Sequence, residues 1–339
     1  MSSQDSKLFA GVVRVLQLPK DHEKDWLSAV EKRDPSVLMA ILLTLTPKLR
    51  VLAFPGGQIM MDPFGQLLHD PAFLANLRTL ELEGDADLYL GYNVGEYHEF
   101  CLKRPVEKLN VKYSSLKGKS FPTSWVPGAL SLENIHLEFC DLDRVSVTKL
   151  LKCCKALNTF VIDNWSQRPP SRSSLETDRK VDFDGRFIYD ALLPHRDTLT
   201  LLQLEFGDSW DLGDGVLLSV DSPAKFPSFR AFSRLEGLRV SHWLLTPYPE
   251  LPPSIKTFFI SNCNVSVRNM THKIAAEYKN GSLPLLEHFL IRSMDLSQTV
   301  KLPGQVIPQG GTPADGFFAL RDLFKDTTVK YDISPYHFP

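Results

Sequence analysis

The chain lacks several features that would assign it to a common functional class. It contains no run of about 18 apolar residues, so we expect no membrane-spanning helix. Its first apolar stretch is short and is interrupted by Arg14, which does not fit a secretory signal peptide. The formal net charge is −2 over 339 residues, whereas nucleic-acid-binding domains are usually basic. We therefore expect neither a membrane nor a nucleic acid as partner.

Cysteine is scarce, and its spacing argues against a disulfide framework. The five cysteines are an odd number at irregular intervals, which favours a reducing compartment, either cytoplasmic or nuclear. Cys153 and Cys154 lie in a predicted helix with no histidine pair at zinc spacing, so we expect them to pack in the core. The motifs G-x-S-x-G, H-E-x-x-H and the glycine-rich dinucleotide fingerprint do not occur. The sequence thus predicts no metal, no cofactor and no enzymatic activity.

Two short stretches resemble ligand-binding loops but depart from their patterns. Gly118-Lys119-Ser120 resembles the end of a phosphate-binding loop, yet Tyr113 stands where that loop needs its first glycine. Asp208, Asp211 and Asp214 suggest a calcium loop, but they miss the alternate-residue spacing and the closing glutamate. We interpret both stretches as ordinary surface segments.

What the chain has instead is a repeated apolar pattern. Residues Leu132–Cys140 read LENIHLEFC and fit L-x-x-L-x-L-x-x-C, the consensus core of a leucine-rich repeat. Weaker copies recur in order along the chain, and each spans a common six-residue core. The ten units begin at Val13, Leu49, Leu77, Val106, Leu132, Leu157, Leu199, Leu235, Ile255 and Leu286.

These repeats predict an α/β fold. Alternating apolar residues indicate a short strand with one buried face, and a single unit has too little core to be stable without its neighbours. We therefore expect a leucine-rich-repeat solenoid, with a curved parallel sheet and with helices or irregular segments on the convex side. Cys140 and Cys263, at the ninth position of their units, should be buried.

The pattern also predicts how the chain is organised. Residues 1–48 should form an N-terminal cap of one strand and two helices, residues 49–300 the solenoid, and residues 301–339 a C-terminal loop and cap. Polar stretches at 167–184 and 208–227 predict inserted surface loops. Helical spacing of apolar residues predicts helices at 25–32, 35–45, 142–155, 185–193, 267–279 and 317–325, and residues 328–333 should form a last strand.

The candidate binding surface is the concave face of the predicted sheet. The third, fifth and seventh residues of each unit should point toward this face. Its middle is acidic and its C-terminal third is basic and apolar, which favours selection of a partner by charge. The candidate partner-binding residues are Glu81, Lys112, His136, Glu138, Asp163, Glu205 and Arg239. Trp210, in the second predicted loop, is a candidate exposed anchor.

Four stretches resemble the fungal leucine-rich-repeat proteins of the F-box superfamily. They are Asp25-Trp26-Leu27 followed by Asp34-Pro35, then Leu42–Leu49 (LLTLTPKL), Leu150–Leu157 (LLKCCKAL) and Ala191–Leu199 (ALLPHRDTL). The resemblance covers about residues 12–300 and implies repeats that hold a protein. Where such proteins have an F-box, it docks a ubiquitin-ligase adaptor and opens with L-P-x-E, whereas here Leu18-Pro19 is followed by Lys20-Asp21.

The sequence favours two functions, and a third, an enzyme of unrecognised type, is disfavoured because no acid, base and nucleophile converge in the repeat pattern. The first is a non-enzymatic, intracellular protein-binding module whose partner is unknown. The second is the substrate-recognition subunit of an SCF-type ubiquitin ligase with a degenerate or absent F-box, which would engage ubiquitin-ligase components.

Overall fold

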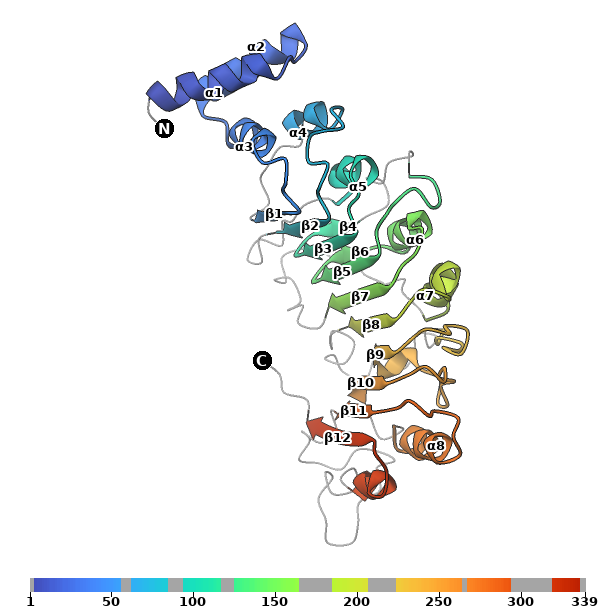
Figure 1. The fold of residues 1–339 in the computed structure, drawn as a ribbon. Coiled ribbons are helices and arrows are strands. Elements are labelled where there is room, and N and C mark those ends of the chain that lie inside the picture. Colours follow the sequence, from blue (N-terminus) through green and yellow to red (C-terminus); the bar gives the residue numbers. More distant parts are fainter. Residues whose placement is uncertain are drawn as a thin grey trace, which may run out of the picture.

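The fold is known from a computed structural model. It describes residues 3–55, 62–84, 94–116, 125–164, 185–206, 224–263, 267–293 and 319–335. Ten strands form one all-parallel sheet whose spatial order follows the sequence (Figure 1). The strands are β1 (Val51–Pro55), β2 (Thr79–Glu83), β3 (Lys108–Lys112), β5 (Asn134–Glu138), β7 (Thr159–Asn164), β8 (Leu201–Phe206), β9 (Gly237–Ser241), β10 (Thr257–Cys263), β11 (His288–Ser293) and β12 (Lys330–Pro335). The predicted α/β class is confirmed.

Helices lie along one side of this sheet and at its N-terminal end (Figure 1). The α-helices are α1 (Ser3–Val15), α2 (Lys20–Lys32), α3 (Pro35–Thr44), α4 (Asp62–Leu67), α5 (His98–Lys103), α6 (Arg144–Cys153), α7 (Gly185–Leu192) and α8 (Val267–Lys279). Shorter 3₁₀ helices are η1 (Val94–Tyr97), η3 (Leu193–His195), η6 (His242–Leu244) and η8 (Ala319–Phe324). A separate pair of two-residue strands, β4 (Ser115–Leu116) and β6 (Asp141–Leu142), was not predicted.

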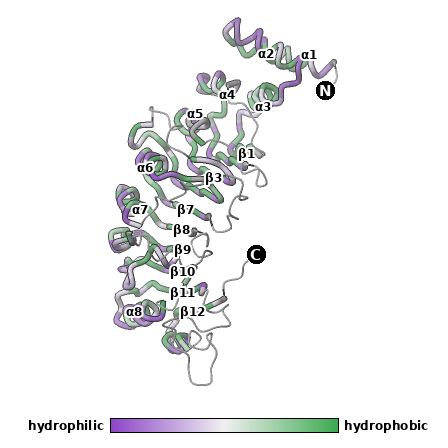
Figure 2. The backbone as a smooth tube through the Cα atoms, turned by 180° about the vertical axis from the view of Figure 1, so that it is seen from behind, coloured by the Kyte–Doolittle hydropathy of each residue, from purple (hydrophilic) through white to green (hydrophobic). Residues whose placement is uncertain are grey.

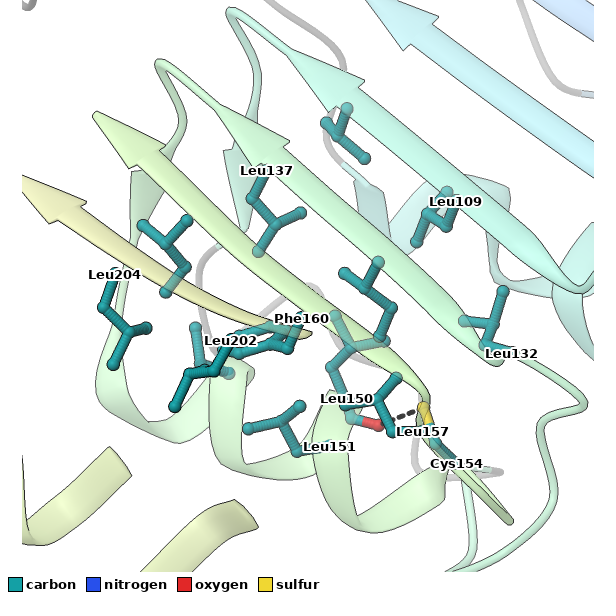
Figure 3. Close-up of a cluster of buried hydrophobic side chains, with 14 of the residues drawn as sticks. Leu109, Leu132, Leu137, Leu150, Leu151, Cys154, Leu157, Phe160, Leu202 and Leu204 are labelled. Atoms are coloured by element: carbon teal, nitrogen blue, oxygen red, sulfur yellow. Dashed lines mark hydrogen bonds between the residues drawn. The ribbon is translucent and has the colours of Figure 1, made fainter. Parts of the chain in front are cut away.

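The packed face of the sheet is an apolar ladder that runs across the strands. Leu109, Ile135 and Phe160 are direct register partners on β3, β5 and β7, and each is at most 1% exposed. Leu150 and Leu151 of α6 are fully buried and lie against this row (Figure 3). Polar and apolar residues alternate along the helices that cover the sheet, because only one side of each helix is packed (Figure 2).

The first predicted strand, which starts at Val13, is wrong. The structure has helix α1 there instead. Val13 is fully buried, and Phe9, Val12 and Leu16 pack against the same core. These residues follow a spacing of three and four, so a helix buries all of them on one side, whereas a strand would divide them between two faces.

Of the other predicted helices and loops, some are confirmed, one has a different helix type, and some lie outside the described residues. The helix predicted at 267–279 matches α8, and Asp143 caps α6 by accepting a hydrogen bond from the Ser146 N–H at 2.8 Å. The helix expected at 317–325 is a 3₁₀ helix, η8, over its described part. The loop at 167–184 and residues 208–223 of the second loop lie outside the described residues. Residues 224–227 are described, and Phe226 among them is buried and forms a bridge with Leu245.

His195 gives the ALLPHRDTL stretch a structural role. It is buried, its Nε2 donates to the Leu151 carbonyl at 2.8 Å, and its Nδ1 accepts from the Leu157 N–H at 3.3 Å. Burial lowers the pKa of His195, even though the bond to Leu151 acts in the opposite direction. A neutral imidazole therefore ties the end of α6 to the segment that enters β7.

Candidate functional site

The side of the sheet away from the apolar ladder carries the third, fifth and seventh residues of each unit, and we call it the open face. Six of the seven candidates lie there with at least a part of each side chain exposed. The register makes Lys112 a direct neighbour of Glu138, and Glu138 a direct neighbour of Asp163. Glu81 and His136 flank Asn110 in the adjacent row. The structure thus brings together the five candidates on β2, β3, β5 and β7.

A shallow depression lies at the centre of this group. It has a volume of about 170 Å³ and spans the ends of β2, β3 and β5. Its lining consists of Glu81, Leu82, Glu83, Asn110, Val111, Lys112, His136 and Glu138. Most of these side chains are polar, so the depression suits a hydrophilic group of a partner better than an apolar one.

Contacts between strands fix the side chains of the depression. Asn110 donates from Nδ2 to Glu81 Oε1 at 2.9 Å, and Lys112 Nζ lies 3.1 Å from Glu138 Oε1. Partial burial by itself lowers the pKa of Lys112, but the hydrogen bond and the negative charge of Glu138 outweigh it, so the net pKa is raised. Lys112 therefore stays protonated and holds Glu138 in place.

Two aromatic residues that sequence reasoning missed adjoin this group. Tyr113 and Phe139 follow β3 and β5 directly, and their rings stack with centroids 5.1 Å apart and an interplanar angle of 15°. The Lys112 ammonium lies 5.3 Å from the Tyr113 centroid and 5.9 Å from that of Phe139. Both rings are half-buried. Their common place, the eighth residue of consecutive units, was the signal available in the sequence.

The backbone of this aromatic pair is left-handed, with φ of 50° at each residue. The Tyr113 N–H donates to the Glu138 carbonyl at 3.1 Å, and the Phe139 N–H donates to the Asp163 carbonyl at 2.9 Å. Each eighth residue therefore adds one more bond between neighbouring units at the end of the strands. Glycine and asparagine adopt this conformation most readily, so a tyrosine and a phenylalanine are unusual there.

Glu205 lies on the open face as predicted, but it is not available as an exposed carboxylate. Its side chain is 1% exposed and forms an ion pair with Arg239. Gln203 donates from Nε2 both to Glu205 Oε2 at 3.0 Å and to Asp163 Oδ2 at 3.1 Å. Burial raises the pKa of Glu205 more than Arg239 lowers it, and the charge of Asp163 adds to the rise. Strand alternation predicts which face a residue occupies but gives no information on how deeply it is buried there.

Arg239 marks the change from the acidic to the basic part of the open face. Its guanidinium lies 4.4 Å from the centroid of Phe259 on the next strand, and the guanidinium of Arg292 lies 5.4 Å from the same ring. Phe259 is 9% exposed, so most of this ring is shielded from solvent. The C-terminal third thus combines cationic and apolar groups, as the sequence indicates.

The remaining predictions concern residues elsewhere in the chain. Trp210, Gly118-Lys119-Ser120 and the three aspartates at 208, 211 and 214 lie outside the described residues. All five cysteines are free and buried, Cys140 and Cys263 among them, as predicted. Burial raises the pKa of Cys101 to about 12 and also raises that of Cys154.

Neither a metal site nor a membrane-spanning helix occurs among the described residues. No group of three or more histidine, cysteine, aspartate or glutamate side chains in this part of the chain could hold a metal ion. Within the same ranges, no helix is both long and apolar enough to cross a membrane.

Comparison with known proteins gives no relative for this chain. No family model, no curated protein and no solved structure matches the chain.

Proposed function

We propose that this chain is a non-enzymatic leucine-rich-repeat solenoid that binds a protein partner on its concave face, which is the open face described above. One observation carries the proposal: charged side chains of β2, β3, β5 and β7 form a contiguous patch held in place by contacts between strands. Such a patch is prepared for binding, because its side chains lose little further conformational freedom when a partner arrives.

The solenoid interpretation rests on the constant position of the strand within each repeat unit. From Leu49 to Leu286, all nine units place their first strand residue two positions after the first apolar residue. Parallel pairing joins the nine strands in sequence order, with one shift of register between β10 and β11 after Ile260. Stacked units that share a sequence pattern and one continuous core are typical of repeat proteins. The resemblance to fungal F-box-superfamily repeat proteins points to the same architecture and to the same kind of partner.

Charge would select the partner. The patch contains Glu81, Glu83, Glu138 and Asp163 against Lys108 and Lys112, so its balance is negative. Beyond Glu205, the open face presents Arg239 and Arg292. A partner with a basic segment over β2 to β7 fits this distribution, and like-charged partners are disfavoured.

The test reverses the charge of the patch. Proximity labelling in the native cell first supplies a partner, and the affinity of the purified partner is then measured for the full chain and for Glu138→Lys/Asp163→Lys. We expect a loss of at least about tenfold, since like charges across an interface cost more than about 1.4 kcal/mol. The melting temperature should fall only slightly, because the Lys112–Glu138 ion pair that is lost is partly exposed and such pairs contribute about 0–1 kcal/mol.

A matched control changes the same amount of charge away from the open face. Glu236→Lys/Glu287→Lys alters two exposed carboxylates at the second position of the units of β9 and β11. This variant should bind the partner as the unchanged chain does. Equal affinity of the unchanged chain and of Glu138→Lys/Asp163→Lys, with equal melting temperatures, would place the binding site on another surface.

A second candidate function is that of a substrate-recognition subunit of an SCF-type ubiquitin ligase. The observation that favours it is the N-terminal end of the structure, where α1, α2 and α3 contact one another in place of the expected strand and two helices. An F-box is a unit of three packed helices, although its L-P-x-E opening is missing here. Leu8 of α1, Leu42 of α3 and Leu45, which directly follows α3, are exposed and would be available to an adaptor.

A pull-down separates the two functions. If the second holds, the full chain recovers the adaptor and the cullin scaffold, and Leu42→Glu/Leu45→Glu loses both while it still binds the partner of the open face. If neither component is recovered by the unchanged chain, the ligase role is excluded.

A further inference from the structure

We propose that the depression between β2, β3 and β5 receives an arginine side chain of the partner protein, with the stacked rings of Tyr113 and Phe139 beside it. The inference rests on the proposed function and deepens it, since it names the chemical group that the open face would recognise. Three observations lead to it: the charge of the depression, its size, and the aromatic pair that adjoins it at Lys112.

The charge of the depression is negative and only partly compensated. Its lining contains the carboxylates of Glu81, Glu83 and Glu138 and a single ammonium, that of Lys112. Lys112 is committed to Glu138 at 3.1 Å. Within the described residues, no lysine or arginine forms an ion pair with Glu81 or Glu83, and Glu81 accepts only the amide hydrogen bond from Asn110. A cation that enters the depression would meet three carboxylates against the single ammonium of Lys112, whose pKa the charge of Glu83, its register neighbour on β2, also raises.

The size of the depression fits one side chain. Its volume of about 170 Å³ lies below the roughly 300–1,000 Å³ of pockets that enclose a drug-sized ligand. Because it opens on a sheet surface, it can accept a long side chain that projects from a partner. A nucleotide or another metabolite of similar size would find too little enclosure.

The aromatic pair beside Lys112 distinguishes the ends of β3 and β5 from the end of β2. In the preceding unit the same eighth position is Gly84, whose N–H donates to the Lys112 carbonyl at 2.8 Å. Tyr113 and Phe139 make the equivalent backbone bonds, so the hydrogen bonding between units does not require a ring at this position. The two rings nevertheless stack with each other and with the Lys112 ammonium. A pair of half-exposed rings with a cation over them is a surface on which a second, planar cation can pack.

These three properties together favour arginine over lysine. A guanidinium is planar, stacks on aromatic faces and donates five N–H groups in a fixed fork, so it can bridge two carboxylates. An ammonium is a compact point charge that offers no planar face to a ring. Glu81 and Glu83 lie two residues apart on the same side of β2, which presents their carboxylates to one bridging group.

The experiment uses three short peptides and the full chain. The probes are acetyl-Gly-Gly-Arg-Gly-Gly-amide and the same peptide with lysine or with citrulline, the neutral isostere of arginine. Binding is followed by two-dimensional NMR of the isotope-labelled chain. We expect the arginine peptide to bind most tightly, the citrulline peptide to bind at least about tenfold more weakly, and the backbone signals of residues 110–113 and 136–139 to shift.

Two variants locate the site. Glu81→Gln/Glu83→Gln removes two of the three carboxylates of the depression and should weaken binding of the arginine peptide by about tenfold. Tyr113→Gly/Phe139→Gly removes the rings but keeps a residue suited to the left-handed backbone, and it should weaken the peptide several-fold. The charge-matched control Glu287→Gln/Asp326→Asn, at two exposed carboxylates, should bind within about twofold of the unchanged chain.

Different experimental outcomes contradict the arginine site and the proposed protein-binding surface. Equal binding of the arginine and citrulline peptides, or unchanged binding by Glu81→Gln/Glu83→Gln, overturns the arginine site. If the partner is still lost from Glu138→Lys/Asp163→Lys, the protein-binding function stands without that site. If the peptides behave as expected while the partner ignores Glu138→Lys/Asp163→Lys, the arginine site stands and the proposed partner surface is wrong.

Discussion

Truncation of one core residue tests the repeat register directly. Ile135 is fully buried on the packed face of β5, between its register partners Leu109 and Phe160. Its neighbour His136 is half-buried on the open face of the same strand. Ile135→Ala should therefore destabilise the protein strongly, whereas His136→Ala should leave its stability almost unchanged.

The expected size follows from the atoms removed and from the rigidity of the site. Ile135→Ala deletes three carbon atoms, and each buried CH₂ contributes about 0.8 kcal/mol, which gives about 2.4 kcal/mol for transfer alone. The space left behind cannot close easily, because ladder hydrogen bonds fix β5 on both sides. The cavity adds to the cost, so the total should be about 2–4 kcal/mol.

The assay is urea unfolding of the full chain followed by circular dichroism. For His136→Ala the free energy of unfolding should stay within about 0.5 kcal/mol of the unchanged chain, as is usual for surface substitutions. If Ile135→Ala were equally mild, or if His136→Ala were the more damaging change, the assignment of the two faces would be refuted.

Three further predictions follow from buried groups. Burial, together with nearby Lys225, lowers the pKa of His242 to about 4. In the unfolded chain the pKa of this histidine is about 6.5. The contribution of His242 to the free energy of unfolding is therefore fully present above about pH 6.5, and up to about 3 kcal/mol of it is lost as the pH falls toward 4. An acid titration of stability should therefore be flatter for His242→Gln, and equal slopes would contradict this. The buried thiols, Cys101 among them, should react with a thiol reagent only after unfolding, and rapid labelling of the folded chain would show otherwise. Gly185→Ala should lower the melting temperature, because its new Cβ would lie 2.1 Å from the Phe226 nitrogen. Gly65→Ala, in open space within α4, is the matched control and should be stabilising by about 0.5–1 kcal/mol.

The sheet could be predicted because its signal is repeated. In the units of β2, β3 and β5 the fourth and sixth residues alternate with polar ones, as Ile135 and Leu137 do around His136, and this alternation predicts which residues face the core. Nine successive units with the same offset also determine the order of the strands. The constraint is physical, since a slip of one residue would expose the whole apolar set of a strand.

The N-terminus could not be predicted in the same way, because one short apolar pattern fits two structures. The stretch from Val13 to Leu18 has the alternation of a repeat strand, while Phe9, Val12, Val13 and Leu16 have the spacing of a helix. Contacts with α2 and α3 decide between the two, and these contacts are not visible in a local window. The burial of Glu205 was missed for a related reason, since its cover depends on neighbours such as Arg239 and Gln203.

The strand ends show how a repeat architecture separates structural residues from functional ones. The eighth residue of a unit continues the backbone ladder, and Gly84, Tyr113 and Phe139 all make the same kind of bond to the next strand. At Asn262 the eighth residue is also left-handed, with φ of 55°, and asparagine suits that conformation. At Tyr113 and Phe139 the side chain opposes the preference of the backbone, so the reason for these residues must lie in the rings themselves. Since the rings adjoin Lys112, which lines a depression together with the predicted binding residues Glu81, His136 and Glu138, the strand ends of β3 and β5 are where binding experiments should begin.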